Sequence, residues 1–231
     1  MNYKKLRNIL YWAVMVIPLF LLTGNVSVYA QEEVSKRAHN RKIVPVDKLI
    51  NRLEDPKRKR LLQPERVLDV FGVKSGECVA DVGAGSGYFT FLLAARVGGK
   101  GKVYAVEIED ELLDYIRRKT DESKVTNIIP LKSSESDPKL PLASCDKILL
   151  VSTYYYLEDP VAFMNNIRMA LKPGGLVAII GVDPTKVKAT KKMITASEVI
   201  DDMKRAGLVL HESFNFLANK YFLVFGANVI E

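Results

Sequence analysis

The chain has 231 residues, of which 48% are hydrophobic and 26% are charged. This length fits one full-sized core, and this composition excludes disordered and low-complexity classes of protein. The net charge is +7, but three basic residues lie among the first seven residues and ten more lie between Lys36 and Arg60. The rest of the chain is close to neutral. This argues against a nucleic-acid-binding domain, because such a domain presents a basic face.

Residues 1–30 have the features of a targeting segment. Basic residues at the start precede an apolar run, Ile9–Leu22, and Val28-Tyr29-Ala30 places small residues at the positions that signal peptidase reads. The pattern predicts a signal peptide that is cleaved after Ala30, and therefore an exported protein. The alternative is an uncleaved membrane anchor, because the stretch Ile9–Ala30 carries no charge and is long enough to span a bilayer.

Residues 31–60 are expected to form a basic tether followed by an N-terminal helix. Apolar residues recur at helical spacing from Val46 to Leu53, and Asp47 is placed to cap the start of this helix. The run Lys57-Arg58-Lys59-Arg60 is interpreted as a solvated face, with contact to anionic lipid as the alternative. The main domain is predicted over residues 61–231.

Within this domain, Pro64 begins a helix that Gly72 ends, and strands then alternate with helices. The predicted strands are 78–82, 102–107, 127–131, 147–152 and 176–181, followed by a terminal antiparallel pair at 209–210 and 221–225. The predicted helices between them are 88–97, 111–120, 161–171 and 196–206. Apolar strands without alternation, separated by helices, indicate an α/β fold whose mostly parallel sheet is covered on both faces.

The first strand leads into a helix through Asp81-Val82-Gly83-Ala84-Gly85-Ser86-Gly87. Without side chains, the backbone of such a loop can approach a ligand closely and point its N–H groups at polar ligand atoms. A dinucleotide site would need Gly-x-Gly-x-x-Gly, and Tyr88 stands where the third glycine belongs, which disfavours a nucleotide-dependent oxidoreductase. Glu107 ends the second strand, where a carboxylate can accept both hydroxyls of a ribose.

The stretch from Asp81 to Thr90 resembles motif I of the class I S-adenosylmethionine (SAM)-dependent methyltransferases. Leu171-Lys172-Pro173-Gly174-Gly175 resembles the turn before their fifth strand. Within the class, the chain is most similar to small bacterial methyltransferases related to the ubiquinone/menaquinone C-methyltransferases, which the stretches 137–141 and 221–225 fit. The resemblance implies SAM as the cofactor. It also implies a Rossmann-like, seven-stranded, mostly parallel sheet with its last strand antiparallel and helices on both faces.

The resemblance further implies which residues contact each part of the cofactor. The methionine moiety would lie against Asp81 and Gly83, and Gly85 and Gly87 of the same loop would also bind the cofactor. The ribose would bind Glu107 and the sulfonium would lie beside Ser152. The adenine would pack on Ile108, with Ser134 or Glu135 at its edge.

The acceptor is expected after the fourth strand, because ligands of open α/β sheets bind outside the carboxyl ends of the strands. Tyr154, Tyr155 and Tyr156 follow that strand, and Tyr88 begins the helix after the glycine loop. These side chains would line a pocket for a small, apolar or aromatic acceptor. The alternative is that they pack beneath the following helix.

No residue is assigned a catalytic role, because methyl transfer from a sulfonium needs little beyond alignment of the reacting atoms. Related proteins carry an acid in place of Ser152 and histidines in place of Tyr155 and Tyr156. A SAM-binding or interaction module without catalysis is therefore the alternative function.

Cys78 and Cys145 each lie near the start of a strand, and these two strands are neighbours in this class of fold. The pair is either a disulfide or two small buried hydrophobic side chains. His39 and His211 have no partner at metal-ligand spacing, so a metal site is not expected.

Overall fold

The structure is a computed structural model that describes residues 45–187 and 193–227. The predicted targeting segment at 1–30, the tether that follows it and His39 lie outside the described residues. The described residues from Pro45 onward belong to one compact unit. Residue 61, where the sequence placed the start of the main domain, lies within the helix Pro56–Leu62. No helix in the described ranges is long and apolar enough to cross a membrane.

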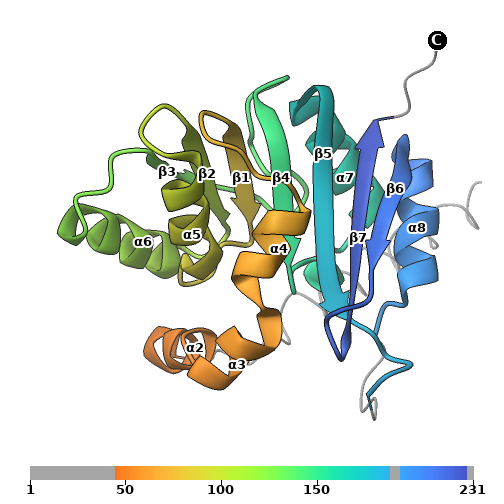
Figure 1. Cartoon of the computed structure of the whole chain (residues 1–231), viewed down its shortest axis with the longest axis horizontal. Coiled ribbons are helices and arrows are strands. Elements are labelled where there is room, and N and C mark those ends of the chain that lie inside the picture. Colours follow the sequence, from red (N-terminus) through yellow and green to blue (C-terminus); the bar gives the residue numbers. More distant parts are fainter. Residues whose placement is uncertain (1–44, 188–192, 228–231) are drawn as a thin grey trace, which may run out of the picture. The chain divides into compact units, whose positions relative to one another are not determined.

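Seven strands form a single sheet in the order β3-β2-β1-β4-β5-β7-β6 (Figure 1). The strands are β1 (Cys78–Val82), β2 (Lys102–Glu107), β3 (Ile128–Lys132), β4 (Cys145–Val151), β5 (Leu171–Val182), β6 (Leu208–Phe214) and β7 (Lys220–Ala227). The first five pair in parallel, and β7 runs antiparallel to both β5 and β6. This confirms the predicted seven-stranded, mostly parallel sheet with an antiparallel last strand.

Helices cover both faces of the sheet. They are α2 (Val46–Leu53), α3 (Pro56–Leu62), α4 (Pro64–Val70), α5 (Tyr88–Val97), α6 (Asp110–Glu122), α7 (Pro160–Ala170) and α8 (Ala196–Arg205), with a short 3₁₀ helix, η1 (Tyr154–Tyr156), after β4. One core cluster joins the sheet to α4, α5 and α6, and the other joins it to α7 and α8. Because successive residues of a strand point to opposite faces, Leu149 enters the first cluster and Leu150 the second.

The segment before β1 forms three helices, where the sequence predicted two. Asp55 starts α3 by accepting a hydrogen bond from the Lys57 N–H at 2.7 Å. The cap predicted at Asp47 is wrong, because α2 begins after Pro45 and has no side-chain cap. Figure 1 shows α2 and α3 at the edge of the sheet where the parallel strands end.

Two strand ends also differ from the prediction. Ser152 was expected to continue β4, but its φ of 58° is left-handed and ends the extended backbone. Leu171 was expected to end α7, but it begins β5. The register between β4 and β5 jumps across residues 172–175, so the Pro-Gly-Gly turn forms an irregularity within β5.

The two cysteines lie on the neighbouring strands β1 and β4, at the ends opposite the glycine loop. Both are free thiols, and Cys145 is buried. A hydrogen bond from Cys145 outweighs burial and lowers the pKa of Cys78 to about 7. The same contact, together with burial, raises the pKa of Cys145. The predicted proximity is confirmed, and the pair is reduced in this structure.

Candidate functional site

The site is built where the chain order of the sheet reverses, between β1 and β4. Ligands of open α/β sheets bind at such a point, outside the carboxyl ends of the strands. Gly83 follows β1 and Thr153 follows β4, and the two residues touch. A Cβ atom added to Gly83 would lie 2.2 Å from Thr153 Oγ1. The segments that leave the two strands therefore pack against each other.

The glycine loop is attached to the end of β2. The N–H groups of Gly83 and Ala84 both donate to the Val106 carbonyl, at 2.8 and 3.0 Å. Gly83 has a φ of 75°, which favours glycine, and the Thr153 side chain fills the space that a Cβ would need. Both conformation and packing therefore require glycine at this position.

Glu107 ends β2 and is 7% exposed. Its Oε2 accepts a hydrogen bond from the Gly85 N–H at 2.8 Å. Its Oε1 accepts from the N–H groups of Ile108 at 2.7 Å and Glu109 at 3.2 Å. Backbone donors from two segments thus fix the carboxylate beside the loop, where the sequence placed the ribose.

The residues expected around the adenine lie at the same edge. The Ser133 N–H donates to the Glu107 carbonyl at 3.0 Å, which ties the loop after β3 to the end of β2. Ser134 follows, and its N–H donates to the Asp137 carbonyl at 2.9 Å. Ile108 is half-buried and Glu135 is exposed. The chain therefore brings Glu107, Ile108 and the Ser134 loop together.

Asp81 lies at the end of β1 and is 3% exposed. Burial raises its pKa to about 6, and the nearby charge of Glu107 acts in the same direction. Thr90 opposes this effect, because its hydroxyl donates to Asp81 Oδ2 at 2.7 Å. The loop is therefore flanked by two buried carboxyl groups, Asp81 and Glu107.

The helices α2 and α3 cover this edge of the sheet. Leu53 contacts the glycine loop, since its Cδ1 would lie 3.0 Å from a Cβ on Gly85. Glu54 forms ion pairs with Lys59 and with Lys119 of α6, at 3.4 Å for the latter. These contacts attach the N-terminal helices to both the loop and α6.

The basic run at 57–60 is only partly solvated, contrary to the interpretation of the sequence. Lys57 and Arg60 are exposed, but Arg58 and Lys59 are half-buried. Arg58 donates to the Leu53 carbonyl at 3.0 Å, and its charge acts on Asp81. Lys59 places its amine 4.6 Å from the ring centre of Tyr88.

Arg58 was not predicted as a site residue, although the sequence contains a signal for it. Leu62 is 1% exposed and lies four residues after Arg58, so both lie on the same face of α3. The helical period therefore indicates which member of the basic run faces inward. Lys220 was also missed. It donates to Ser152 Oγ at 3.5 Å across the sheet, a contact that no local pattern reveals.

The tyrosines after β4 divide into two groups. Tyr154 was expected to line the acceptor pocket, but it is 1% exposed and its hydroxyl donates to Asp202 of α8 at 3.0 Å. It therefore takes the packing role, because its ring fills the core beneath α8. Tyr155 and Tyr156 are about half exposed, and their ring centres lie 3.8 Å apart. These two and Tyr88 remain as candidates to border an acceptor.

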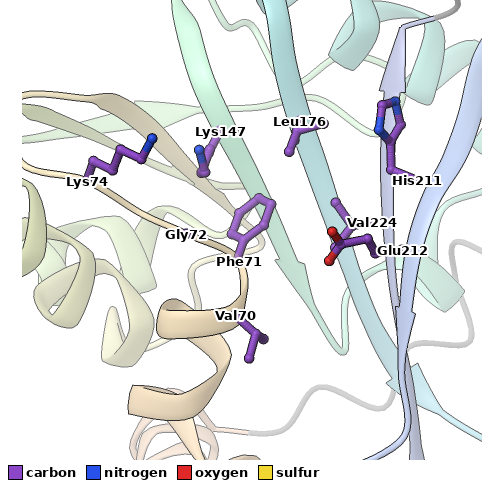
Figure 2. Close-up of a pocket in the computed structure, with 9 residues that line it drawn as sticks. All are labelled: Val70, Phe71, Gly72, Lys74, Lys147, Leu176, His211, Glu212 and Val224. Atoms are coloured by element: carbon purple, nitrogen blue, oxygen red, sulfur yellow. The ribbon is translucent and has the colours of Figure 1, made fainter.

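A separate hollow of about 260 Å³ lies on the sheet face beside α4 (Figure 2). Phe71, Leu176 and Val224 form its apolar part, and Lys147 and His211 lie at its border. It includes no residue of the glycine loop and lies apart from Glu107. This hollow is therefore distinct from the site at the carboxyl ends of the strands.

Residues 73–222 match the model of a family described as a methyltransferase domain. The crystal structure of a SAM-dependent methyltransferase from Aquifex aeolicus is 30% identical, with a TM-score of 0.72 over 79% of this chain and 98% of that chain. The site at the carboxyl ends of β1 and β4 thus lies within a methyltransferase domain that this chain shares with the Aquifex aeolicus protein.

Two curated proteins show the same similarity over shorter stretches. Aklanonic acid methyltransferase DauC from Streptomyces sp. strain C5 is 27% identical over 49% of this chain and 51% of its own length. The ubiquinone/menaquinone biosynthesis C-methyltransferase UbiE from Shewanella oneidensis is 24% identical over 65% of this chain and 61% of its own length. The chain thus spans between half and two thirds of these relatives.

Gly83→Ala tests the packing of the loop, with Gly174→Ala as its matched control. The two glycines have φ angles of 75° and 76°, but no atom lies within 4 Å of a Cβ on Gly174. The control should therefore lose only about 1–2 kcal/mol of unfolding free energy from its left-handed backbone. Gly83→Ala should lose roughly 1–3 kcal/mol more through overpacking. Urea unfolding measures both, and equal losses would contradict the contact with Thr153.

Asp81→Asn tests the burial of the Asp81 carboxyl group. Because the pKa of about 6 in the folded chain lies above the ordinary value of 3.8, folding favours the protonated acid. The wild-type protein should therefore lose stability as the pH rises from about 4 to 6, by ~3 kcal/mol in total. The variant lacks this titration. Its unfolding free energy relative to wild type should rise across that range, and a constant difference would show that Asp81 is not buried as described.

Proposed function

Because the chain belongs to the SAM-dependent methyltransferase family, we propose that it transfers a methyl group from SAM to a small acceptor at the carboxyl ends of β1 and β4. The observation that carries this proposal is the hydrogen bond from the Gly85 N–H to the Glu107 carboxylate at 2.8 Å. It joins the glycine loop to the acid in one buried site. A carboxylate there suits a ribose, and it would repel a phosphate in the same position.

The residues present fit SAM. The glycine loop leaves its backbone without side chains beside Glu107, and Asp81 lies at its base. The Ser86 hydroxyl of this loop is buried and forms no hydrogen bond of good geometry among the described residues. It lies near Glu54 and helps to lower the pKa of that acid, against the effect of burial. When bound, SAM supplies an activated methyl group on a positively charged sulfur.

The chain's own contribution is to bind and orient the reactants and to exclude water. Leu53 at the end of α2 lies against Gly85, which limits the access of solvent to the glycine loop. Holding two reactants in alignment can supply much of the reduction in barrier height. A general base is needed only if the acceptor atom begins protonated.

Tyr88, Tyr155 and Tyr156 support an acceptor with an apolar or aromatic body. Tyr155 and Tyr156 present half-exposed rings just after β4, and Tyr88 is half-buried where the glycine loop meets α5. Exposed aromatic rings at the end of a strand offer large apolar surfaces to a planar ligand. The charge of Arg52 on α2 also acts on Tyr155, so the helix lies close to these rings.

The proposal extends to export or membrane anchoring through residues 1–30, on the basis of their sequence pattern. The basic residues that follow would support contact with anionic lipid. SAM is made in the cytosol, so the side of the membrane on which the domain lies determines its supply of cofactor.

Glu107→Ala should weaken the binding of SAM and of S-adenosylhomocysteine by ~1–3 kcal/mol, because charged hydrogen bonds to the ribose are lost. Glu111→Ala, at an exposed position in the first turn of α6, is the control and should bind as the wild type does. Calorimetry measures both affinities. Absence of wild-type binding to either ligand would overturn the proposed function, and binding without methyl transfer to phenols or quinols would favour a non-catalytic module.

The mature N-terminus tests the proposal for residues 1–30. If the segment is a cleaved signal, mass spectrometry of the protein from the exporting cell should find Gln31 as the first residue. An intact N-terminus in the membrane fraction would support the anchor instead. Intact protein in the soluble cytosolic fraction would contradict both.

A further inference from the structure

Lys220 lies at the carboxyl edge of the parallel strands, although it belongs to the antiparallel strand. It is the first residue of β7 and pairs with Val182 at the end of β5. Its amine donates to Ser152 Oγ at 3.5 Å, at the tip of β4. The reversed direction of β7 thus places a cation at the part of the site where the sequence positions the sulfonium and the acceptor.

This cation has no acidic partner in the part of the chain that the structure describes. Within the described residues, its amine donates a hydrogen bond to Ser152, and the nearby charge that acts on it is that of Arg58. Lys147 gives a contrast, because it is also largely buried but pairs with Glu77 at 3.1 Å. Burying a charge without a counter-ion costs free energy. This cost indicates that an anionic ligand pairs with Lys220.

The surroundings of Lys220 further disfavour its charged form unless an anion binds beside it. Burial lowers the pKa of Lys220 first, and the positive charge of Arg58 lowers it further. Arg58 acts on the carboxyl group of Asp81, so Arg58 has an acid in its surroundings. A bound sulfonium would add another positive charge near Ser152. SAM also carries a carboxylate, but its methionine moiety is expected against the glycine loop, so a negative group on the acceptor would be the source of compensation on the Lys220 side.

We infer that Lys220 determines specificity by pairing with an ionised carboxylate on the methyl acceptor, above Ser152. This inference rests on the proposed function, because it assigns the acceptor side of the same site. The ammonium group holds the acid, and the half-exposed tyrosines contact the apolar body of the acceptor. Neutral acceptors of the same shape would leave Lys220 without a counter-ion, so the site should discriminate against them.

The test measures binding of two matched probes to the full chain saturated with S-adenosylhomocysteine. The probes are 4-hydroxybenzoate and its neutral analogue 4-hydroxybenzamide, followed by calorimetry or ligand-observed NMR. The wild type should bind the acid at least about tenfold more tightly than the amide, the scale of one charged hydrogen bond. Lys220→Met should reduce this preference to about twofold or less, and Lys220→Arg should keep most of it. Lys100→Met, at an exposed position after α5, should bind both probes as the wild type does.

The outcomes distinguish this inference from the function on which it rests. S-adenosylhomocysteine binding is measured first, and its absence in the wild type would overturn the proposed function itself. If the ligand binds but the wild type does not prefer the acid, including the case in which neither probe binds, the role of Lys220 is overturned. A preference that persists in Lys220→Met has the same effect. Lys220→Gln provides a second neutral variant if Lys220→Met does not fold, and both are checked by their binding of S-adenosylhomocysteine.

Discussion

The hydrogen bond between the Gly85 N–H and the Glu107 carboxylate connects the two strands on which the site depends. It joins the loop after β1 to the end of β2, and the Val106 carbonyl adds two further bonds from Gly83 and Ala84. Parallel pairing of β1 with β2 and with β4 brings all of these carboxyl ends to one edge. The packing of Gly83 against Thr153 belongs to this arrangement, and the proposed ribose site depends on it.

The balance of charge at this edge is the second constraint on the site. Asp81 and Glu107 are buried there, and Arg58 of α3 acts both on Asp81 and on Lys220 of β7. Backbone N–H groups stabilise Glu107, whereas burial disfavours the charged form of Asp81. The buried acids support the proposed contacts with the ribose and methionine moiety of SAM, and Lys220 supports the proposed anionic acceptor.

The regular elements around the loop were predictable because several local signals coincide there. The strand 78–82, the helix 88–97 and the strand 102–107 were all expected with the bounds that the structure shows. Apolar runs of strand length, separated by glycines and a helical period, leave few alternatives. Errors occurred where local signals were weak. The start of β5 was hidden because Leu171 satisfies both the helical pattern before it and the strand after it.

The glycine loop, the acid at the end of β2 and the order of strands and helices could be predicted, because each depends on residue spacing within a short segment. Which neighbouring side chains enter the site depends instead on contacts between distant segments. Tyr154 and Tyr155 are adjacent, yet one is buried beneath α8 and the other is half exposed. Arg58 and Lys220 are far apart in sequence and act on one another, because α3 covers the strand ends and β7 runs in the reverse direction.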